Sequence, residues 1–321
     1  MKHIGKSYDK VDAKGILSGK PSYTGDFVPK DALIIKVLRS PHAQAKIKSI
    51  DTSKAKLIPG VEAIFTYEDV PNTRFTLAGQ TYPEPSAYDA LILDSVVRYV
   101  GDEVALVVAK DEATALKAMP LIKVEYEVQK PVLDLHTAMD HETVVHPEDD
   151  ILNHIPVGQD YKRNICVSYH KSVGDIEAEL AKCDYVVEGT YFDQATRQSA
   201  MEPFQSFGYI DHLGRIVIVS STQIVFHVRR HIARALGIPA SKIRVIKPRI
   251  GGGFGSKQTA CTELMTAFVT WKLQKPCYLL YDRTEAQTCS TTRHAREWYI
   301  RLGATKDGII QVIDMDSITA A

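Results

Sequence analysis

The sequence predicts an α+β protein in two parts joined by an extended connector. Short strand-like and helix-like segments alternate over residues 31–130, which indicates one unit of mixed structure. Residues 131–165 lose this periodicity and are acidic and rich in turn formers. Strand and helix patterns then resume. We therefore expect a first domain at 1–130, a linker at 131–165 and a second domain at 166–321.

Turn-forming residues separate the predicted elements of the first part. Asp51 is expected to cap a short helix, which a turn at Pro59 and Gly60 follows. Gly101 interrupts a β-rich stretch and predicts a turn or bulge, and Pro120 closes the next helix. The predicted strands are ALIIKVLRS, VEAIFTY, VVRYVGDEVALVVA and IKVEYEV, and the helices lie in IDTSKAKL and KDEATALKAM.

The second part contains the strongest helical pattern of the chain. The pattern stops at Gly237 and consists of apolar residues at helical spacing: Ile224, Val228, Ile232 and Leu236. Further helices are predicted in GDIEAELAKC and TELMTAFVTWKL, with strands in YVVEGTYF, RIVIVSSTQ, IRVI and CYLLYD. The last segment, DGIIQVIDMDSITAA, alternates as a strand to its end. We expect another chain, or a longer polypeptide, to complete this domain.

The composition excludes several classes of protein. Lysine plus arginine equals aspartate plus glutamate at 39 each, which argues against a nucleic-acid binder. No apolar run is long enough to span a bilayer, and the first residues resemble no export signal, so we expect a cytoplasmic protein without a membrane contact. The five cysteines form no C-x-x-C pair, which suits reduced thiols and excludes an iron–sulfur cluster carried by this chain alone.

The stretch IKPRIGGGFGSKQTA, residues 246–260, is the main candidate site. A glycine loop between a strand and a helix lets the backbone approach a ligand closely and aims N–H groups at it. The stretch is neither a Walker A loop, because Ser256 separates Gly255 from Lys257, nor a G-x-G-x-x-G fingerprint. From the glycines alone, a tight strand-to-helix turn is slightly the better interpretation.

The wider sequence resembles the molybdenum hydroxylases, the xanthine dehydrogenase and aldehyde oxidase family. The resemblance is greatest to the separate molybdopterin-binding subunit of bacterial xanthine dehydrogenases. It rests on SSTQIVFHVRRHIARALGIPASKIRVIKPRIGGGFGSKQ together with LRSPHAQAKIKSID, IPGVEAIFTYEDVP, VRYVGDEVALVVA and MEPFQSF in the family's order. It implies an α/β hammerhead domain at 1–130, followed by the first part of a molybdopterin-binding domain.

The resemblance also implies residue roles. The glutamine of the TQ motif falls on Gln223, and the cofactor-binding loop falls on Gly251, Gly252, Gly253, Phe254 and Gly255. No side chain is expected to bind the metal directly, because a pterin dithiolene holds it. Gln258 takes the place of a substrate-binding glutamate of the eukaryotic xanthine enzymes, and Gln198 stands where the family often has a histidine. The family's catalytic glutamate would fall beyond residue 321, so no catalytic residue is assigned and the chain alone is expected to be inactive.

The implied activity is hydroxylation of an N-heterocycle such as a purine, with oxygen derived from water. The cofactor would be molybdopterin, in the plain or the cytosine dinucleotide form. An iron–sulfur subunit, an FAD subunit and a second molybdopterin-domain chain are the implied partners. The alternative is a non-catalytic accessory protein that holds pterin or binds a partner.

Other candidate residues have simpler readings. Glu202 in MEP has no partner visible in the sequence and is expected to be structural. Arg229 and Arg230 follow Gln223 on a helix, and most such arginines are solvated. His227 and His231 have the i, i+4 spacing of metal ligands, but without a third ligand a zinc site is not expected.

Overall fold

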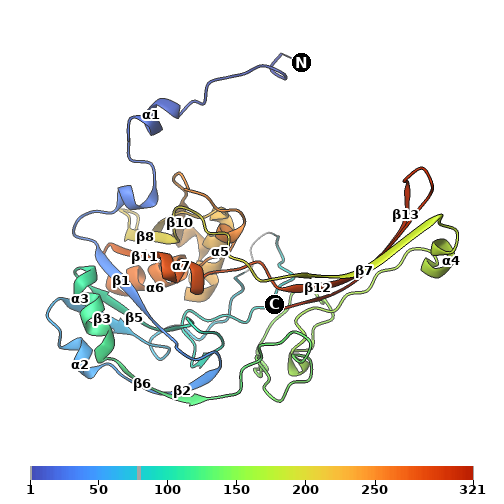
Figure 1. Cartoon of the computed structure of the whole chain (residues 1–321). Helices are drawn as coiled ribbons and strands as arrows, with labels where there is room; N and C mark the ends of the chain where they lie inside the picture. The colour runs from blue at the N-terminus through green and yellow to red at the C-terminus, as the bar shows by residue number, and fades with distance from the viewer. Residues whose placement is uncertain (1, 78–80, 321) are drawn as a thin grey trace.

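A computed structural model describes residues 2–77 and 81–320. The outer limits of the two predicted domains, residues 1 and 321, lie outside the described residues. The body of the molecule is built on a seven-stranded mixed sheet with strand order β10-β9-β8-β11-β1-β5-β3 (Figure 1). The strands of this sheet are β1 (Leu33–Arg39), β3 (Val61–Phe65), β5 (Glu103–Ala109), β8 (Gln205–Ile210), β9 (Ile216–Ser220), β10 (Ile243–Ile246) and β11 (Cys277–Leu280).

This sheet runs through both of the predicted domains. Strand β1 pairs in parallel with β11, with Leu33 opposite Cys277, and in antiparallel with β5 on its other side. Strands β9 and β10 are parallel, and β8 is antiparallel to both β9 and β11. The seven-stranded sheet therefore contains strands from both before and after residues 131–165. The division of the chain into two domains at these residues stays a prediction.

Two helices cover the part of the sheet that carries the glycine loop. Helix α5 (Val225–Leu236) packs on β10, and α6 (Glu263–Leu273) packs on β8, β9 and β11. The periodic residues of α5 lie in the main core, and the helix ends at Gly237, whose φ of 64° is in the left-handed region, as predicted. Helix α6 is buried from Glu263 to Thr270, where it packs against the sheet and against α5.

The first part adds a second sheet and two short helices. Strands β2 (Ala45–Asp51), β4 (Val96–Val97) and β6 (Lys123–Val128) form a sheet of order β4-β2-β6. The predicted break at Gly101 is confirmed, with a φ of 105°. The N-cap of α2 (Ser53–Lys56) is Thr52 and not Asp51, which instead accepts the N–H of Ser53 at 2.9 Å. Helix α3 (Glu112–Ala118) ends before a 3-10 turn η2 (Met119–Leu121) that contains Pro120.

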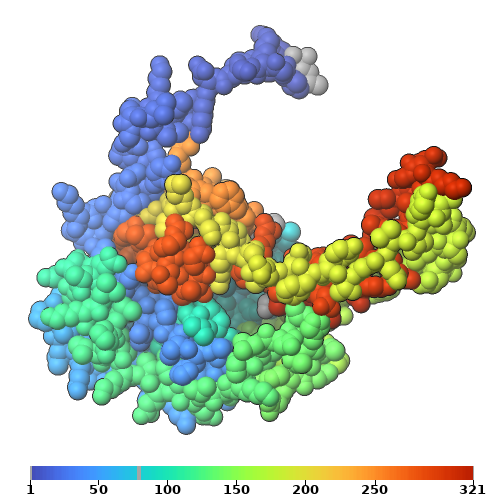
Figure 2. Space-filling model, in the orientation of Figure 1, coloured from blue at the N-terminus to red at the C-terminus, as the bar shows by residue number. Residues whose placement is uncertain are grey.

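An arm projects from the body (Figures 1 and 2). It consists of β7 (Tyr185–Asp193), β12 (Arg296–Ala304) and β13 (Ile310–Thr319) in the order β13-β12-β7, with helix α4 (Ile176–Leu180) on it. The connector before the arm contains the 3-10 turn η3 (Tyr161–Arg163). At the other end of the chain, helix α1 (Ala13–Leu17) extends away from the body toward the N-terminus (Figure 1). The remaining elements are α7 (Arg283–Thr288), η1 (Thr24–Phe27), η4 (Ala240–Lys242) and η5 (Ser256–Gln258).

Within the described residues, no helix has the length and apolar character that crossing a membrane requires.

Candidate cofactor-binding site

The glycine loop and Gln223 come together at one end of the parallel pair β9 and β10. Gln223 follows β9 and immediately precedes the N-cap of α5, while the loop follows β10. The backbone N–H of Gln223 donates to the carbonyl of Lys257 at 2.8 Å. Because β9 and β10 run side by side in the same direction, residues that follow them meet at the same edge of the sheet. The structure therefore brings the two predicted parts of the site into contact.

Gly253 is required by the side chain of Gln223. A Cβ atom at residue 253 would lie 2.4 Å from Gln223 Oε1 and 2.7 Å from its Cδ, closer than packed atoms approach. Gly253 is buried, and Gln223 Oε1 is buried without a hydrogen-bond partner among the described residues. A buried amide oxygen without a partner is unfavourable, so such an atom marks a place where a further group can bind.

Glu202 anchors the start of the loop. Its Oε2 accepts the backbone N–H of Gly251 at 2.6 Å, and its own N–H donates to the Gly251 carbonyl at 3.0 Å. Its Oε1 accepts from Gln205 Nε2 at 2.7 Å. A Cβ at residue 251 would lie 2.6 Å from Glu202 Cβ, so the two chain segments touch directly.

Lys257 completes this anchor from the other end of the loop. Its Nζ lies 3.0 Å from both the carbonyl oxygen and Oε2 of Glu202. The exposed fractions of the two side chains are 1% for Lys257 and 8% for Glu202. Burial lowers the pKa of Lys257, and the Glu202 carboxylate opposes that effect. Glu202 is thus structural, as predicted, but its partner Lys257 was not anticipated.

The tip of the loop is open. Gly252 and Gly255 have φ values of 95° and 94°, and Phe254 has a φ of 52°, so three of four successive residues adopt the left-handed region. The ring of Phe254 is 66% exposed, and a Cβ at Gly255 would meet nothing within 4 Å. Ser256 holds the turn closed, because its N–H and Oγ both donate to the Gly253 carbonyl at 2.9 and 2.7 Å.

The 3-10 turn η5 follows the glycine loop directly, ahead of helix α6. Helix α6 begins only at Glu263, several residues after the last glycine. Glu263 Oε2 accepts the N–H groups of Cys261 and Thr262 at 3.0 and 3.1 Å, and its Oε1 accepts from Ser220. Burial raises the pKa of Glu263. The N–H groups at the start of α6 are therefore satisfied by the helix's own glutamate.

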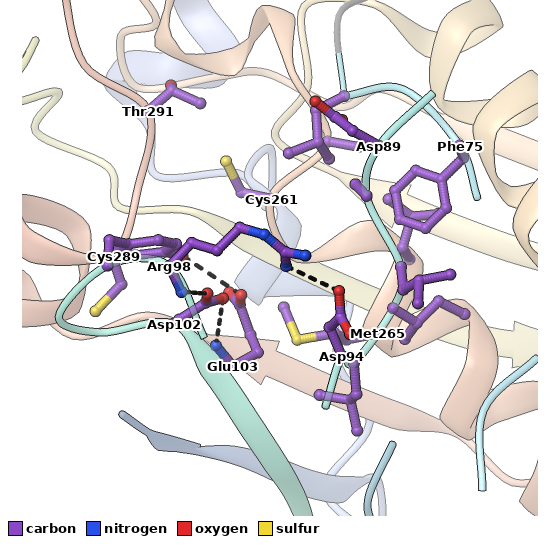
Figure 3. Close-up of a pocket in the computed structure, with 18 of the residues that line it drawn as sticks. Phe75, Asp89, Asp94, Arg98, Asp102, Glu103, Cys261, Met265, Cys289 and Thr291 are labelled. Atoms are coloured by element: carbon purple, nitrogen blue, oxygen red, sulfur yellow. Dashed lines mark hydrogen bonds and ion pairs between the residues drawn. The ribbon is translucent and has the colours of Figure 1, made fainter. Parts of the chain in front are cut away.

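A cavity of about 530 Å³ lies beside the site, between the first part of the chain and the start of α6 (Figure 3). Cys261 and Thr291 line it, and Thr291 Oγ1 donates to the Ser256 carbonyl at 3.2 Å. On the opposite wall Arg98 donates to Asp94 at 2.8 Å. Burial, reinforced by the neighbouring Glu103, raises the pKa of Asp102 to about 8. Apolar wall residues include Phe75, Leu93, Leu264, Met265 and Tyr281.

The remaining candidates lie next to the loop but do not line the large cavity. Gln258 ends the turn η5, is half-buried, and its N–H donates to the Gly255 carbonyl at 3.1 Å. Gln198 lines a small crevice that also includes Glu202 and Ser256. The large cavity is lined by Ala260 and Cys261 rather than by Gln258, among the described residues.

The helix after Gln223 is fixed by ion pairs rather than by a metal. Arg230 contacts the buried carboxylate of Glu84, which also accepts from Tyr88 at 2.8 Å, and His227 Nδ1 lies 2.8 Å from Arg230 Nη2. Arg229 Nε donates to the Ala240 carbonyl at 2.8 Å. Both arginines are therefore engaged within the protein, contrary to the expectation that they are solvated. The part of the chain that is described contains no cluster of three His, Cys, Asp or Glu suited to a metal ion.

These features fit a bound pterin cofactor. A bare, open loop allows the backbone to approach a flat ligand. A glutamine with an unpaired buried oxygen offers both a donor and an acceptor at the loop. The Glu202–Lys257 pair anchors the two ends of the loop and leaves its tip at Gly255 open. Fold and site together are typical of a cofactor-binding domain.

Comparison with known proteins identifies the family. The molybdopterin cofactor-binding domain matches residues 157–321, and the α/β hammerhead domain of aldehyde oxidase and xanthine dehydrogenase matches residues 18–130. The chain belongs to the aldehyde oxidase and xanthine dehydrogenase family of molybdopterin-binding proteins. The predicted fold class, a hammerhead domain followed by a molybdopterin-binding domain, is confirmed.

Individual relatives cover nearly all of this chain. It is 39% identical over 337 residues to the probable hypoxanthine oxidase XdhD of Escherichia coli (strain K12), covering 98% of this chain and 35% of that protein. It is 31% identical to the nicotinate dehydrogenase large molybdopterin subunit of Eubacterium barkeri, covering 98% of this chain and 69% of that one. The aldehyde oxidoreductase of Desulfovibrio gigas superposes with a TM-score of 0.83 at 26% identity, covering 98% of this chain and 34% of that chain. The chain thus spans about a third of the length of the first of these relatives.

Proposed function

We propose that the chain is part of the molybdenum-binding subunit of a hydroxylase that oxidises an N-heterocycle, purine-like or nicotinate-like, with oxygen derived from water. The observation that carries the proposal is the contact of Gly253 with Gln223, which leaves an unpaired buried amide oxygen beside an open loop. Family membership supports the cofactor, and the names of two relatives, a hypoxanthine oxidase and a nicotinate dehydrogenase subunit, support a heterocyclic substrate.

In this proposal the chain binds and orients the cofactor. Residues 251–255 lie against it, the unpaired Gln223 Oε1 accepts a hydrogen bond from an N–H or O–H group of the cofactor, and Gln223 Nε2 donates to one of its oxygen atoms. The Glu202–Lys257 pair keeps the loop at a fixed distance from the sheet. When bound, the molybdenum cofactor supplies two-electron oxidation of a substrate carbon. Preorganised contacts of this kind orient a cofactor without costing reorganisation energy during turnover.

Gln258 is assigned to the substrate side of the loop. Its amide can donate and accept hydrogen bonds, but it lacks the charge of a carboxylate. A neutral side chain suits a ring nitrogen or carbonyl of a heterocycle. An aldehyde is the second candidate substrate class, because the aldehyde oxidoreductase of Desulfovibrio gigas shares the fold closely.

Electrons must leave the site through other carriers. The five cysteines, at residues 166, 183, 261, 277 and 289, are all free and are too dispersed in sequence to form a cluster motif. We assign the iron–sulfur clusters and FAD to partner chains, and the assembled enzyme to the cytoplasm. The proposed cofactor is molybdopterin, in the plain or the cytosine dinucleotide form.

The test is the cofactor content of the complex purified from its native host. Molybdenum by mass spectrometry of metals and pterin by fluorescence should both be present in equal amounts. The Gln223→Ala variant should keep its melting temperature but lose turnover by roughly 100-fold, the order expected for removing one oriented donor. The matched control Gln311→Ala changes an exposed glutamine on the arm and should retain full turnover.

A native complex without molybdenum or pterin would contradict the proposal and favour a non-catalytic accessory protein. Full turnover in the Gln223→Ala variant would also contradict it.

A further inference from the structure

The two faces of the arm differ sharply in composition. In an antiparallel sheet, residues directly opposite each other project to the same side. The register places Leu302 opposite Val187 on β7 and Ile313 on β13. It places Ile300 opposite Gly189 and Met315, and Trp298 opposite Tyr191 and Ser317. We call this side the apolar arm face, defined by Val187, Tyr191, Trp298, Ile300, Leu302, Ile313 and Met315.

This face carries no charged side chain between its Trp298 and Leu302 rows, yet it is open. The exposed fractions are 62% for Val187, 57% for Ile313 and 52% for Met315, with Tyr191 at 55%. Contiguous exposed apolar surface on a folded protein marks a site of interaction, because leaving it in water is unfavourable.

The opposite face is covered at its Gly303 end by α4. Leu180 and Cys183, at and after the end of α4, lie against Gly303, where an added Cβ would be 2.6 Å from Cys183 Sγ. Arg301 on that face donates to Glu177 of α4 and to Asp314, both at 2.7 Å. Val312 is 5% exposed beneath this layer. An antiparallel sheet with one solvated side needs an apolar layer on the other, and within the described residues the apolar arm face has none.

The lengths of the relatives indicate what covers it. The alignment with XdhD covers 98% of this chain but only 35% of the length of XdhD. The alignment with the nicotinate dehydrogenase large molybdopterin subunit covers 69% of the length of that subunit. The family therefore carries further polypeptide in addition to the part represented here. Leaving the apolar side of this sheet in water is unfavourable, so a covering layer has an energetic reason to bind there.

We propose that the apolar arm face is the docking surface for polypeptide equivalent to the part of these relatives that this chain does not match. The occupant contributes an apolar layer over Val187, Ile313 and Met315, and it arrives either in the same polypeptide or as a separate chain. The proposal deepens the proposed function, since it names the surface that joins this chain to the rest of the molybdopterin-binding subunit.

Photo-crosslinking in the native complex tests the proposal. Met315 and Asp316 are neighbours on β13, both exposed, and they face opposite sides of the arm. A benzoylphenylalanine at residue 315 should crosslink to a peptide whose sequence matches the unmatched part of the relatives, while residue 316 should give at most a tenth of that yield. Peptide mapping by mass spectrometry identifies the occupant without any activity measurement, so failure here is separable from failure of the proposed function.

Three outcomes would overturn the inference: a crosslink from residue 315 to a second copy of residues 1–321, a crosslink to an iron–sulfur or flavin polypeptide, or equal yields at 315 and 316. A second variant guards against misfolding. Ile313→Lys should weaken assembly at least tenfold, whereas Asp316→Lys on the other face should not. Both should leave the circular dichroism of the isolated chain unchanged, because both side chains are exposed. Unimpaired assembly of Ile313→Lys would contradict the proposal.

Discussion

Replacing Gly253 with alanine is expected to displace the side chain of Gln223. The new Cβ would lie 2.4 Å from Gln223 Oε1, whereas ordinary contact begins at 3.4 Å, so the amide must move by roughly 1 Å. Gly253 does not have a positive φ, so the backbone itself accepts alanine. The cost is therefore steric, and overpacking of this kind destabilises by about 1–3 kcal/mol.

A double-mutant cycle isolates this contact. Truncation by Gln223→Ala removes the Oε1, Cδ and Cγ atoms that the new Cβ would meet, so Gly253→Ala should then cost less than about 0.5 kcal/mol. The free energy of unfolding of the four proteins is measured by urea titration, with the slope held equal among them. Equal costs of Gly253→Ala in the two backgrounds would refute the contact, and with it the positioning of Gln223 by the loop.

Three further predictions follow from the same geometry. Glu202→Gln leaves Lys257 buried without a carboxylate partner and should lower the free energy of unfolding by about 3–5 kcal/mol, measured by urea titration. Combining it with Lys257→Met should recover at least half of that loss. A wild-type urea midpoint for Glu202→Gln would contradict the ion pair as the anchor of the loop. Gly255→Ala should cost about 1–2 kcal/mol through its φ of 94°, equally in the presence and absence of Gln223, because its Cβ meets nothing within 4 Å. The folded-state pKa of Asp102, about 8, lies above its ordinary value of 3.8, so between these values the folded protein binds a proton that the unfolded chain does not. The free energy of unfolding should therefore fall as the pH rises from about 4 to 8, by at most about 1.4 kcal/mol per pH unit. Asp102→Asn should flatten that fall, and an unchanged pH profile in this variant would count against the buried carboxyl.

Local patterns predicted the elements that depend on neighbouring residues. Helix α5 follows from its periodic apolar residues and from Gly237, because periodicity and a left-handed cap are both short-range features. The Gly101 break was found for the same reason. The start of α6 was placed correctly, although the sequence did not show that the carboxylate of Glu263 accepts the N–H groups before that helix.

Long-range pairings could not be predicted in this way. The sheet joins β1 to β11 across most of the chain, and no local pattern specifies that register. The Glu202–Lys257 pair is separated by 55 residues, so the sequence displayed two charged residues without showing that they meet. A lysine two residues after the last glycine of the loop was the available signal, since a buried lysine requires a carboxylate partner. The roles of Gln223 and of residues 251–255 rest on the family resemblance and remain predictions.

The most direct test of the central claim is a crystal structure of the native complex at a resolution that defines hydrogen bonds. The account predicts pterin density against the backbone of residues 251–255, with the Gln223 amide within about 3 Å of a cofactor oxygen. A loop packed against protein side chains, with the cofactor bound elsewhere in the complex, would contradict the account.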